Sequence, residues 1–185
     1  MATKVSREQI VDYITWVERR PAEFPAVFET KAVRRIGVGG YLTFLFENNQ
    51  TIRYQVQEMM RVEHIVREAD ILHELQTYNE LLGGPGELGC TLMIEIPTAE
   101  ERDVLLVKWL GLPSHVYLTV GDGTKIRPSF DARQVGDTRL SSVQYLKFNT
   151  GGRPPVAIGV DHAALTAEMT LTQQQRNALA SDLGR

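Results

Sequence analysis

The clearest periodic pattern of apolar and polar side chains lies in residues 51–69, a stretch with no Gly or Pro. At about 100° per residue, its apolar residues gather on one broad side of a helix, and most of its charged residues lie on the other. The apolar side consists of Ile52, Val56, Met59, Val62, Val66 and Ala69. The pattern predicts a long amphipathic helix at the centre of the fold.

Three polar residues of this predicted helix depart from the division into two sides. Gln55 projects close to the middle of the apolar side, Glu63 projects within it, and Glu58 lies at its edge. A buried carboxylate must find a cation or a metal, take up a proton, or stay in water. Two interpretations remain open. Glu58 and Glu63 either pair with a cation such as Arg61 in a structural network, or they belong to a functional site.

The segments before this helix are predicted to be helical and then to form a β-hairpin. Ser6 and Gln9 fit a capping box at the start of a helix that ends at Pro21. A short second helix follows. The glycines of residues 37–41 then turn a hairpin between residues 32–38 and 41–47.

The second half of the chain changes from helices to strands. Asp70 caps a helix that ends at the glycines of residues 83–86, and Thr98 with Glu101 begins another. The predicted elements are helix 71–82, strand 88–96, helix 99–110, strands 116–120 and 125–130, strand 142–148, strand 156–160 and helix 172–183.

This order of elements, joined by short turns, predicts an α+β fold: a largely antiparallel sheet with a long central helix and flanking helices. A chain of 185 residues fits a single domain over residues 1–185. Within it, we expect an N-terminal helical arm over about 1–30 and a terminal helix over about 172–183.

Composition narrows the class of protein. With 43% hydrophobic and 23% charged residues, the chain is typical of soluble globular proteins. No apolar run approaches the roughly 20 residues needed to span a bilayer, and the N-terminus lacks the apolar core of a signal peptide. The single cysteine, Cys90, excludes an internal disulfide and a cysteine-based metal site within one chain. We therefore expect a cytoplasmic protein without a membrane partner.

Two features that suggest nucleotide or nucleic-acid binding are weak. The GVGGY segment at residues 37–41 lacks the third glycine and the following helix of a dinucleotide fingerprint. The basic residues Lys31, Arg34 and Arg35 could bind an acidic partner or phosphate, but such a run is more often a solvated face. The net charge of −3 gives no electrostatic reason to expect nucleic acid.

Histidine positions suggest two further sites. His64 and Glu68 stand one turn apart in the predicted central helix, so they could bind a divalent metal or simply form an exposed pair. His162 follows a short apolar strand, where a side chain can line a cleft as an acid–base group or bond to the backbone of a turn. With Glu58 and Glu63, His162 completes a candidate catalytic set.

A polar cleft beside the central helix is the other candidate. Helical spacing suggests that Arg53, Gln55, Gln57 and Arg61 line it, with Tyr78 contributed by the next helix. These residues form the candidate ligand-binding set.

Several segments resemble one known family. They are RRIGVGGYLTFLFEN, TIRYQVQEMMRVEHI, ELQTYNELL, LMIEIPTAEERDVLLVKWLGL, SSVQYLKF and VAIGVDH. Together they resemble the uncharacterised bacterial family called domain of unknown function 3501, over nearly the whole chain. Ala163 departs from the proline expected after Asp161 and His162, which puts the geometry of that turn in doubt.

The resemblance implies no activity, only a context. Genes of this family tend to lie beside those for rubrerythrin-like and iron–sulfur oxidoreductase proteins, which are thus the implied partners. Our leading hypothesis is an accessory protein that binds a partner or small ligand in a redox or oxidative-stress system. The alternative is a metal- or acid–base-dependent enzyme with a site around the central helix. Assembly into a homo-oligomer is left open.

Overall fold

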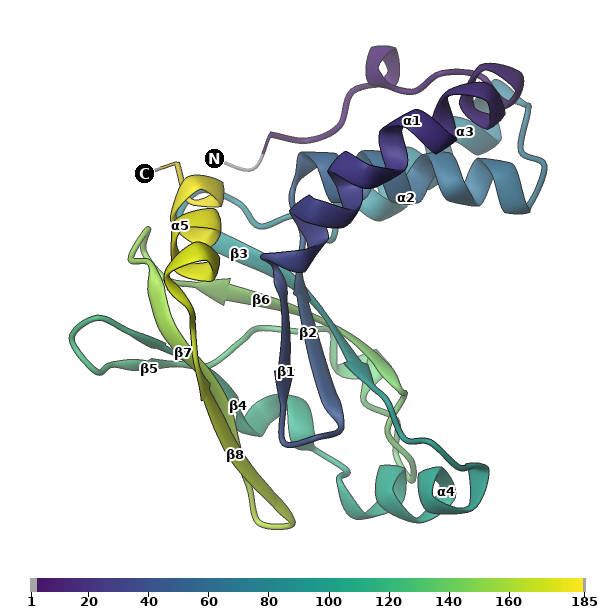
Figure 1. Cartoon of the computed structure of the whole chain (residues 1–185). Coiled ribbons are helices and arrows are strands. Elements are labelled where there is room, and N and C mark those ends of the chain that lie inside the picture. The colour runs from purple at the N-terminus through teal and green to yellow at the C-terminus, as the bar shows by residue number, and fades with distance from the viewer. Residues whose placement is uncertain (1–2, 185) are drawn as a thin grey trace.

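The computed structural model describes residues 3–184, so residues 1, 2 and 185 of the expected domain lie outside the described part. Residues 3–184 form five α-helices and two four-stranded sheets. Figure 1 shows three helices gathered at one end of the molecule and the two sheets below them. The fold is therefore an α+β single domain, as the sequence predicted, although the strands divide between two sheets.

The first sheet joins segments from both halves of the chain. Its strands lie in the order β1 (Arg35–Val38), β2 (Leu42–Phe46), β3 (Glu87–Ile94) and β6 (Val143–Asn149). Every neighbouring pair is antiparallel. The glycine turn between β1 and β2 confirms the predicted hairpin, with Gly39 and Gly40 both at positive φ.

The second sheet is built from the C-terminal half alone. Its order is β5 (Lys125–Ile126), β4 (Val116–Val120), β7 (Pro155–His162) and β8 (Leu165–Thr170), again antiparallel throughout. The sequence analysis missed β8, whose residues are mostly exposed, although Leu165, Ala167 and Met169 alternate with polar residues along it. Strand β8 pairs with β7 over six residue pairs, from Ala157–Thr170 to His162–Leu165.

The main apolar core lies between the two sheets. Its fully enclosed members include Phe44 and Phe148 from the first sheet and Leu118 and Ile158 from the second. Helix α5 (Gln173–Asp182) adds Leu179 to the same core.

Three helices form a separate layer, which we call the helical layer: α1 (Tyr13–Ala32), α2 (Asn49–Val62) and α3 (Glu68–Asn79). A second apolar cluster joins α2 to α3 and to residues before α1. The predicted stop at Pro21 is wrong, because α1 runs through both Pro21 and Pro25. Ser6 and Gln9 do bond to each other, but they precede only the short 3-10 helix Arg7–Gln9.

The predicted central helix is also wrong in its length. It ends at Val62, and His64 adopts a left-handed conformation with φ 54°. The amide of Ile65 donates to the carbonyl of Met60, and Ile65 packs on the cluster that contains Met60. This is the Schellman type of helix end, with His64 where glycine is usual. No glycine or proline in the sequence marks this end.

The remaining elements tie the layers together. Helix α4 (Ala99–Lys108) follows β3, and the side chain of Thr98 caps it as predicted. Arg34 makes a buried bidentate ion pair with Asp182 of α5, so the expectation of a solvated basic face is wrong for Arg34. Among residues 3–184, no helix combines the length and the apolar composition needed to cross a bilayer.

Candidate ligand-binding site

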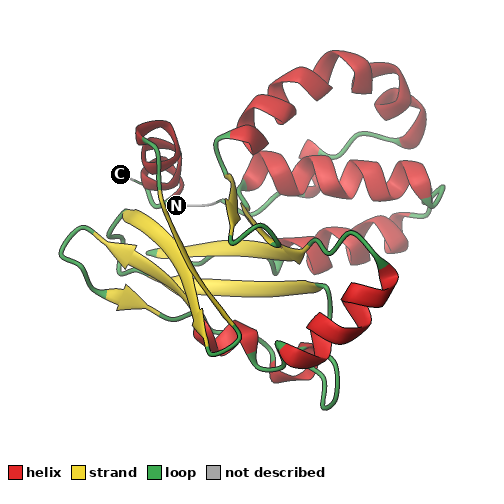
Figure 2. Cartoon of the chain, turned by 60° about the horizontal axis from the view of Figure 1, so that its bottom comes forward, coloured by secondary structure: helices red, strands yellow, loops and turns green. Residues whose placement is uncertain are grey.

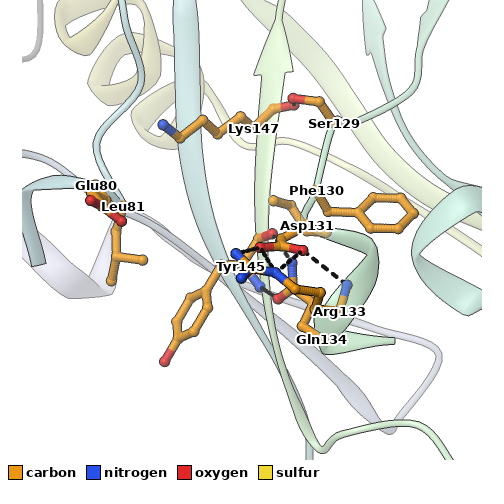
Figure 3. A pocket seen from close by; sticks show the side chains of 10 residues that line it. Glu80, Leu81, Ser129, Phe130, Asp131, Arg133, Gln134, Tyr145 and Lys147 are labelled. Carbon is orange, nitrogen blue, oxygen red and sulfur yellow. Dashed lines mark hydrogen bonds and ion pairs between the residues drawn. The ribbon is translucent and has the colours of Figure 1, made fainter. Parts of the chain in front are cut away.

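A cavity of about 740 Å³ opens between the end of α3 and the loop that precedes β6. Such a volume lies in the range of about 300–1,000 Å³ typical of small-molecule sites. Figure 3 shows Leu81 and Phe130 on opposite sides, with Lys147 and Tyr145 between them at different heights. The cavity is lined by Glu80, Leu81, Ser129, Phe130, Asp131, Arg133, Gln134, Tyr145, Leu146 and Lys147.

Strand β6 supplies one wall because its side chains alternate. Gln144, Leu146 and Phe148 are buried, whereas Tyr145 is 46% exposed and Lys147 is half-buried. Period-two geometry places Tyr145 and Lys147 on the same outward face.

The loop wall is attached to the free edge of β6 by polar contacts. Ser129 and Lys147 exchange two backbone hydrogen bonds. The Gln134 side chain accepts from the Tyr145 amide at 2.6 Å and donates to the Tyr145 carbonyl at 3.0 Å. The carboxamide of Gln134 thereby takes the place of a neighbouring peptide group on the edge of the sheet.

Some of the charged residues that line the cavity have an ion-pair partner and others do not. Arg133 forms an ion pair with Asp131, and its hydrogen bonds lower the pKa of that carboxyl to about 2. Within residues 3–184, by contrast, no carboxylate lies within 4.0 Å of the Lys147 ammonium group. Lys147 is the cation that remains available to a ligand.

Two residues of the predicted ligand-binding set, Gln55 and Tyr78, lie near this cavity but are not among the residues that line it. Burial raises the pKa of Tyr78, and a hydrogen bond with Gln55 opposes that shift. Tyr145 of the cavity wall also raises the pKa of Tyr78, through its charge when ionised. Tyr78 stands two residues before Glu80 in the chain. Gln55 and Tyr78 therefore stand behind the cavity wall rather than in it.

A smaller cavity of about 350 Å³ lies next to the first and shares Glu80 and Lys147 with it. Its other wall is the glycine-rich segment after α3, which includes Gly83 and Gly84. A Cβ on Gly83 would lie 2.4 Å from the carbonyl oxygen of Glu87, so only glycine fits there. The Lys147 side chain stands between the two cavities.

Glu58 belongs to a different place, the contact between α1 and α2. Its carboxylate accepts hydrogen bonds from Trp16 Nε1 at 3.0 Å, Arg20 Nε at 2.8 Å and Arg61 Nε at 3.1 Å. Burial alone would raise the pKa of Glu58, but these donors outweigh it and lower the pKa to about 2. Glu58 is therefore a permanently charged structural carboxylate at neutral pH.

The other polar residues of α2 are also engaged within the chain. Arg53 pairs with Glu23 of α1. The fully buried Gln57 accepts from the Val11 amide at 2.7 Å and donates to the Val11 carbonyl at 3.2 Å. Arg53 and Gln57 therefore fasten α1 and the segment before it to α2, and Arg61 pairs with Glu58 of its own helix. None of the three lines the cavity.

The candidate metal pair does not share a helix. His64 lies in the turn after α2 and packs on the ring of Tyr13, whereas Glu68 begins α3 and forms a bidentate pair with Arg7. Glu63 is exposed and directly follows Val62, the last residue of α2, so it is not a member of the helix's apolar side. No group of three or more metal-ligating side chains occurs within the described residues.

His162 lies far from α2, at the end of β7. Its ring meets that of His115 at 5.0 Å, and its Nδ1 accepts from the Ala164 amide at 3.2 Å. Asp161 instead forms a bidentate pair with Arg127. The β7–β8 turn and α2 lie at opposite ends of Figure 1, so Glu58, Glu63 and His162 do not meet.

The cavity residues Lys147, Tyr145, Phe130 and Gln134 were missed as site residues. The alternation of residues 142–148 did place Tyr145 and Lys147 on one face. The sequence could not show which residues face Tyr145 and Lys147. The opposite wall comes from residues 80–81 and 129–134, and only tertiary folding brings these together.

Comparison with known proteins places the chain in a family. Residues 4–183 match the family described as "Protein of unknown function (DUF3501)". A crystal structure of a novel protein of unknown function from Burkholderia pseudomallei has a TM-score of 0.89 and 28% sequence identity, covering 98% of this chain and 100% of that chain. No curated protein matches the sequence. Because the family match spans almost every residue, this chain belongs to the DUF3501 family.

Proposed function

We propose that this protein binds a small molecule in the cavity between α3 and the 129–134 loop. The observation that carries the proposal is the combination of volume and lining. Leu81, Phe130 and Tyr145 offer apolar and aromatic surface, and one unpaired ammonium group, that of Lys147, stands at the wall. Ligand sites characteristically combine a mostly apolar lining with few polar groups that fix orientation.

The charges indicate the class of ligand. Asp131 and Arg133 neutralise each other, and in residues 3–184 neither Lys147 nor the exposed Glu80 has an ion-pair partner. Lys147 supplies the positive charge that a ligand would meet, and the carboxylate of Glu80 lies on the α3 side of the cavity. A molecule with an apolar or aromatic body and one anionic group fits this arrangement, because the ring walls take the body and Lys147 takes the anion.

The role of an accessory protein in a redox system remains a prediction of the family context. The only thiol, Cys90, is buried and burial raises its pKa well above the ordinary value, so it is poorly suited to thiolate chemistry. We therefore propose that any such role is exerted by binding a ligand or partner. The rubrerythrin-like and iron–sulfur partners stay part of this hypothesis.

Titration with 8-anilinonaphthalene-1-sulfonate, an aromatic anion, tests the proposal. We expect saturable fluorescence with one site per chain, weakened roughly five- to tenfold by Lys147→Met through loss of one charge-assisted contact. Tyr145→Ala should weaken binding further by removing aromatic surface.

Lys108→Met is the matched control, since Lys108 is an exposed lysine in the last turn of α4. It should leave the titration unchanged. Equal affinity of the wild-type protein and Lys147→Met would contradict the proposal and would place the dye on another apolar surface.

A further inference from the structure

Helix α1 carries an exposed row of large apolar side chains. Ile14, Val17, Phe24 and Phe28 are 69%, 44%, 44% and 63% exposed. Their spacings of three, seven and four residues place them on one side of the helix, with Pro21 among them. We call these four residues the α1 stripe. Such a row on a folded surface typically marks an interaction site.

The rest of the described chain leaves most of this stripe uncovered, although the ring centroid of Phe24 lies 6.4 Å from that of Tyr54 on α2. The side of α1 that packs on α2 is defined by the buried Trp16 and Val27, which cluster with Tyr54. On a helical wheel, the stripe points roughly 100° away from that side. Figures 1 and 2 both show α1 as the outermost helix of the helical layer.

The charges on α1 argue for a protein rather than a lipid surface. The helix has three acidic residues, Glu18, Glu23 and Glu29, and three basic ones, Arg19, Arg20 and Lys31. Amphipathic helices that lie on membranes have a polar face rich in Lys and Arg, which α1 lacks.

The two edges of the stripe differ in charge. The exposed Glu18 and Glu29 lie along one edge. The other edge adjoins α2 and presents Arg20 and Arg61, whose side chains are 36% and 34% exposed and share the single carboxylate of Glu58. One edge is thus acidic and the other carries a net positive charge.

This distribution is complementary to a second copy of itself in one orientation. In a twofold dimer whose two α1 helices run parallel, the acidic edge of each copy faces the basic edge of the other. In an antiparallel pair, the acidic edges of the two copies would face each other, as would the basic edges, and these like charges would repel. Complementary potentials of this kind set the partner and the orientation at interfaces.

We propose that two copies of this chain associate through the α1 stripe, with the two α1 helices parallel. Each stripe residue then meets its own counterpart, and Glu18 and Glu29 face the Arg20–Arg61 edge of the other copy. The seam from Ile14 to Phe28 is about 21 Å long at 1.5 Å per residue. A contact between two single helices over this length buries less than the roughly 800 Å² per partner of a standard stable interface. We therefore expect a reversible dimer that forms at micromolar concentration.

Sedimentation velocity from about 1 to 200 μM tests the association. The wild-type protein should shift from monomer to dimer across this range, and Phe28→Glu should remain a monomer with an unchanged melting temperature. Val104→Glu is the matched control, because Val104 on α4 is 65% exposed and should leave the dimer intact. A wild-type protein that stays monomeric at 200 μM overturns the proposal.

Oxidative crosslinking tests the orientation. Ile14→Cys and Phe28→Cys are made separately, in a chain whose natural Cys90 is buried. In a parallel pair each variant crosslinks to itself, since a disulfide needs Cα atoms about 4.4–6.8 Å apart. Crosslinking only in a mixture of the two variants would show an antiparallel pair and overturn the charge argument.

Discussion

Different forces stabilise the core between the two sheets and the contact between α1 and α2 in the helical layer. Between the sheets, Phe44, Phe148 and Leu118 are fully enclosed in one apolar core. Between α1 and α2, much of the contact is polar, through the pairs Arg20–Glu58 and Arg53–Glu23. Apolar burial stabilises independently of pH, whereas ion pairs depend on the charge of each partner. The helical layer is thus the part whose stability the solution conditions can tune.

The same contrast appears in two carboxylates. Glu58 has three strong donors, which lower its pKa to about 2. Glu47, at the junction of β2 and α2, is 8% exposed and accepts hydrogen bonds from the hydroxyls of Thr51 and Thr91, with the charge of Lys31 acting more weakly on it. Burial therefore raises the pKa of Glu47, and the two hydroxyl bonds only oppose that shift. Charged donors decide which direction a partly buried carboxylate takes.

The largest effect should come from the sheet core. Phe44→Ala removes a fully buried ring and should lower the free energy of unfolding by about 3–5 kcal/mol. Urea denaturation measures it, with Leu72→Ala as the control because Leu72 on α3 is 47% exposed. A loss equal to that of the control would mean that the sheets do not share a tightly packed core.

Glu58→Gln should have a smaller and more local effect. It weakens hydrogen bonds to charged donors and should cost about 1–3 kcal/mol. Hydrogen exchange should accelerate in α1 while the amides of β3 and β7 keep their protection. Faster exchange in the sheets as well would show that the helical layer and the sheets unfold as one unit.

The two carboxylates should respond to pH in opposite directions. The folded-state pKa of Glu58 is lowered, so its contribution is present above the ordinary pKa of 4.5 and is lost as the pH falls toward 2. The folded-state pKa of Glu47 is raised, so its contribution is present below 4.5 and is lost as the pH rises through the folded-state value.

Comparison of each Gln variant with the wild-type protein by denaturation at several pH values checks these signs. The wild-type protein should gain stability over Glu58→Gln, and lose it relative to Glu47→Gln, as the pH rises. The same sign for both residues would refute the assignment of opposite shifts.

The smallest effect should come from the ion pair between Arg7 and Glu68. Their side chains are 33% and 59% exposed, so water screens the pair and Glu68→Gln should change the free energy of unfolding much less than Glu58→Gln does. A loss as large as that of Glu58→Gln would remove the distinction between the partly buried and the exposed ion pairs of the helical layer.

Local patterns in the sequence predicted the elements whose signals lie within a few residues. The glycine turn between β1 and β2, the caps at Thr98 and Thr172, and the alternation along β6 are such signals, and each of these elements is present. Their formation depends on neighbouring residues, so the sequence alone could reveal them.

Errors arose where distant segments override the local preference. Pro21 lies within α1, and His64 ends α2 in a conformation that usually needs glycine. The apolar contact of Ile65 with the cluster around Met60 stabilises that end. The ion pair of Arg34 with Asp182 joins residues 148 positions apart, which no local pattern can reveal.

By itself, the sequence determined the α+β class, most helices and strands, the family resemblance and the shared face of Tyr145 and Lys147. Only the tertiary structure decided that Glu58 is a structural carboxylate, that His162 lies far from it, and that the cavity forms where residues 80–81, 129–134 and 145–147 converge. The physical reason is that side-chain periodicity depends on adjacent residues, whereas a carboxylate's pKa and a cavity's walls depend on groups that folding brings from elsewhere in the chain.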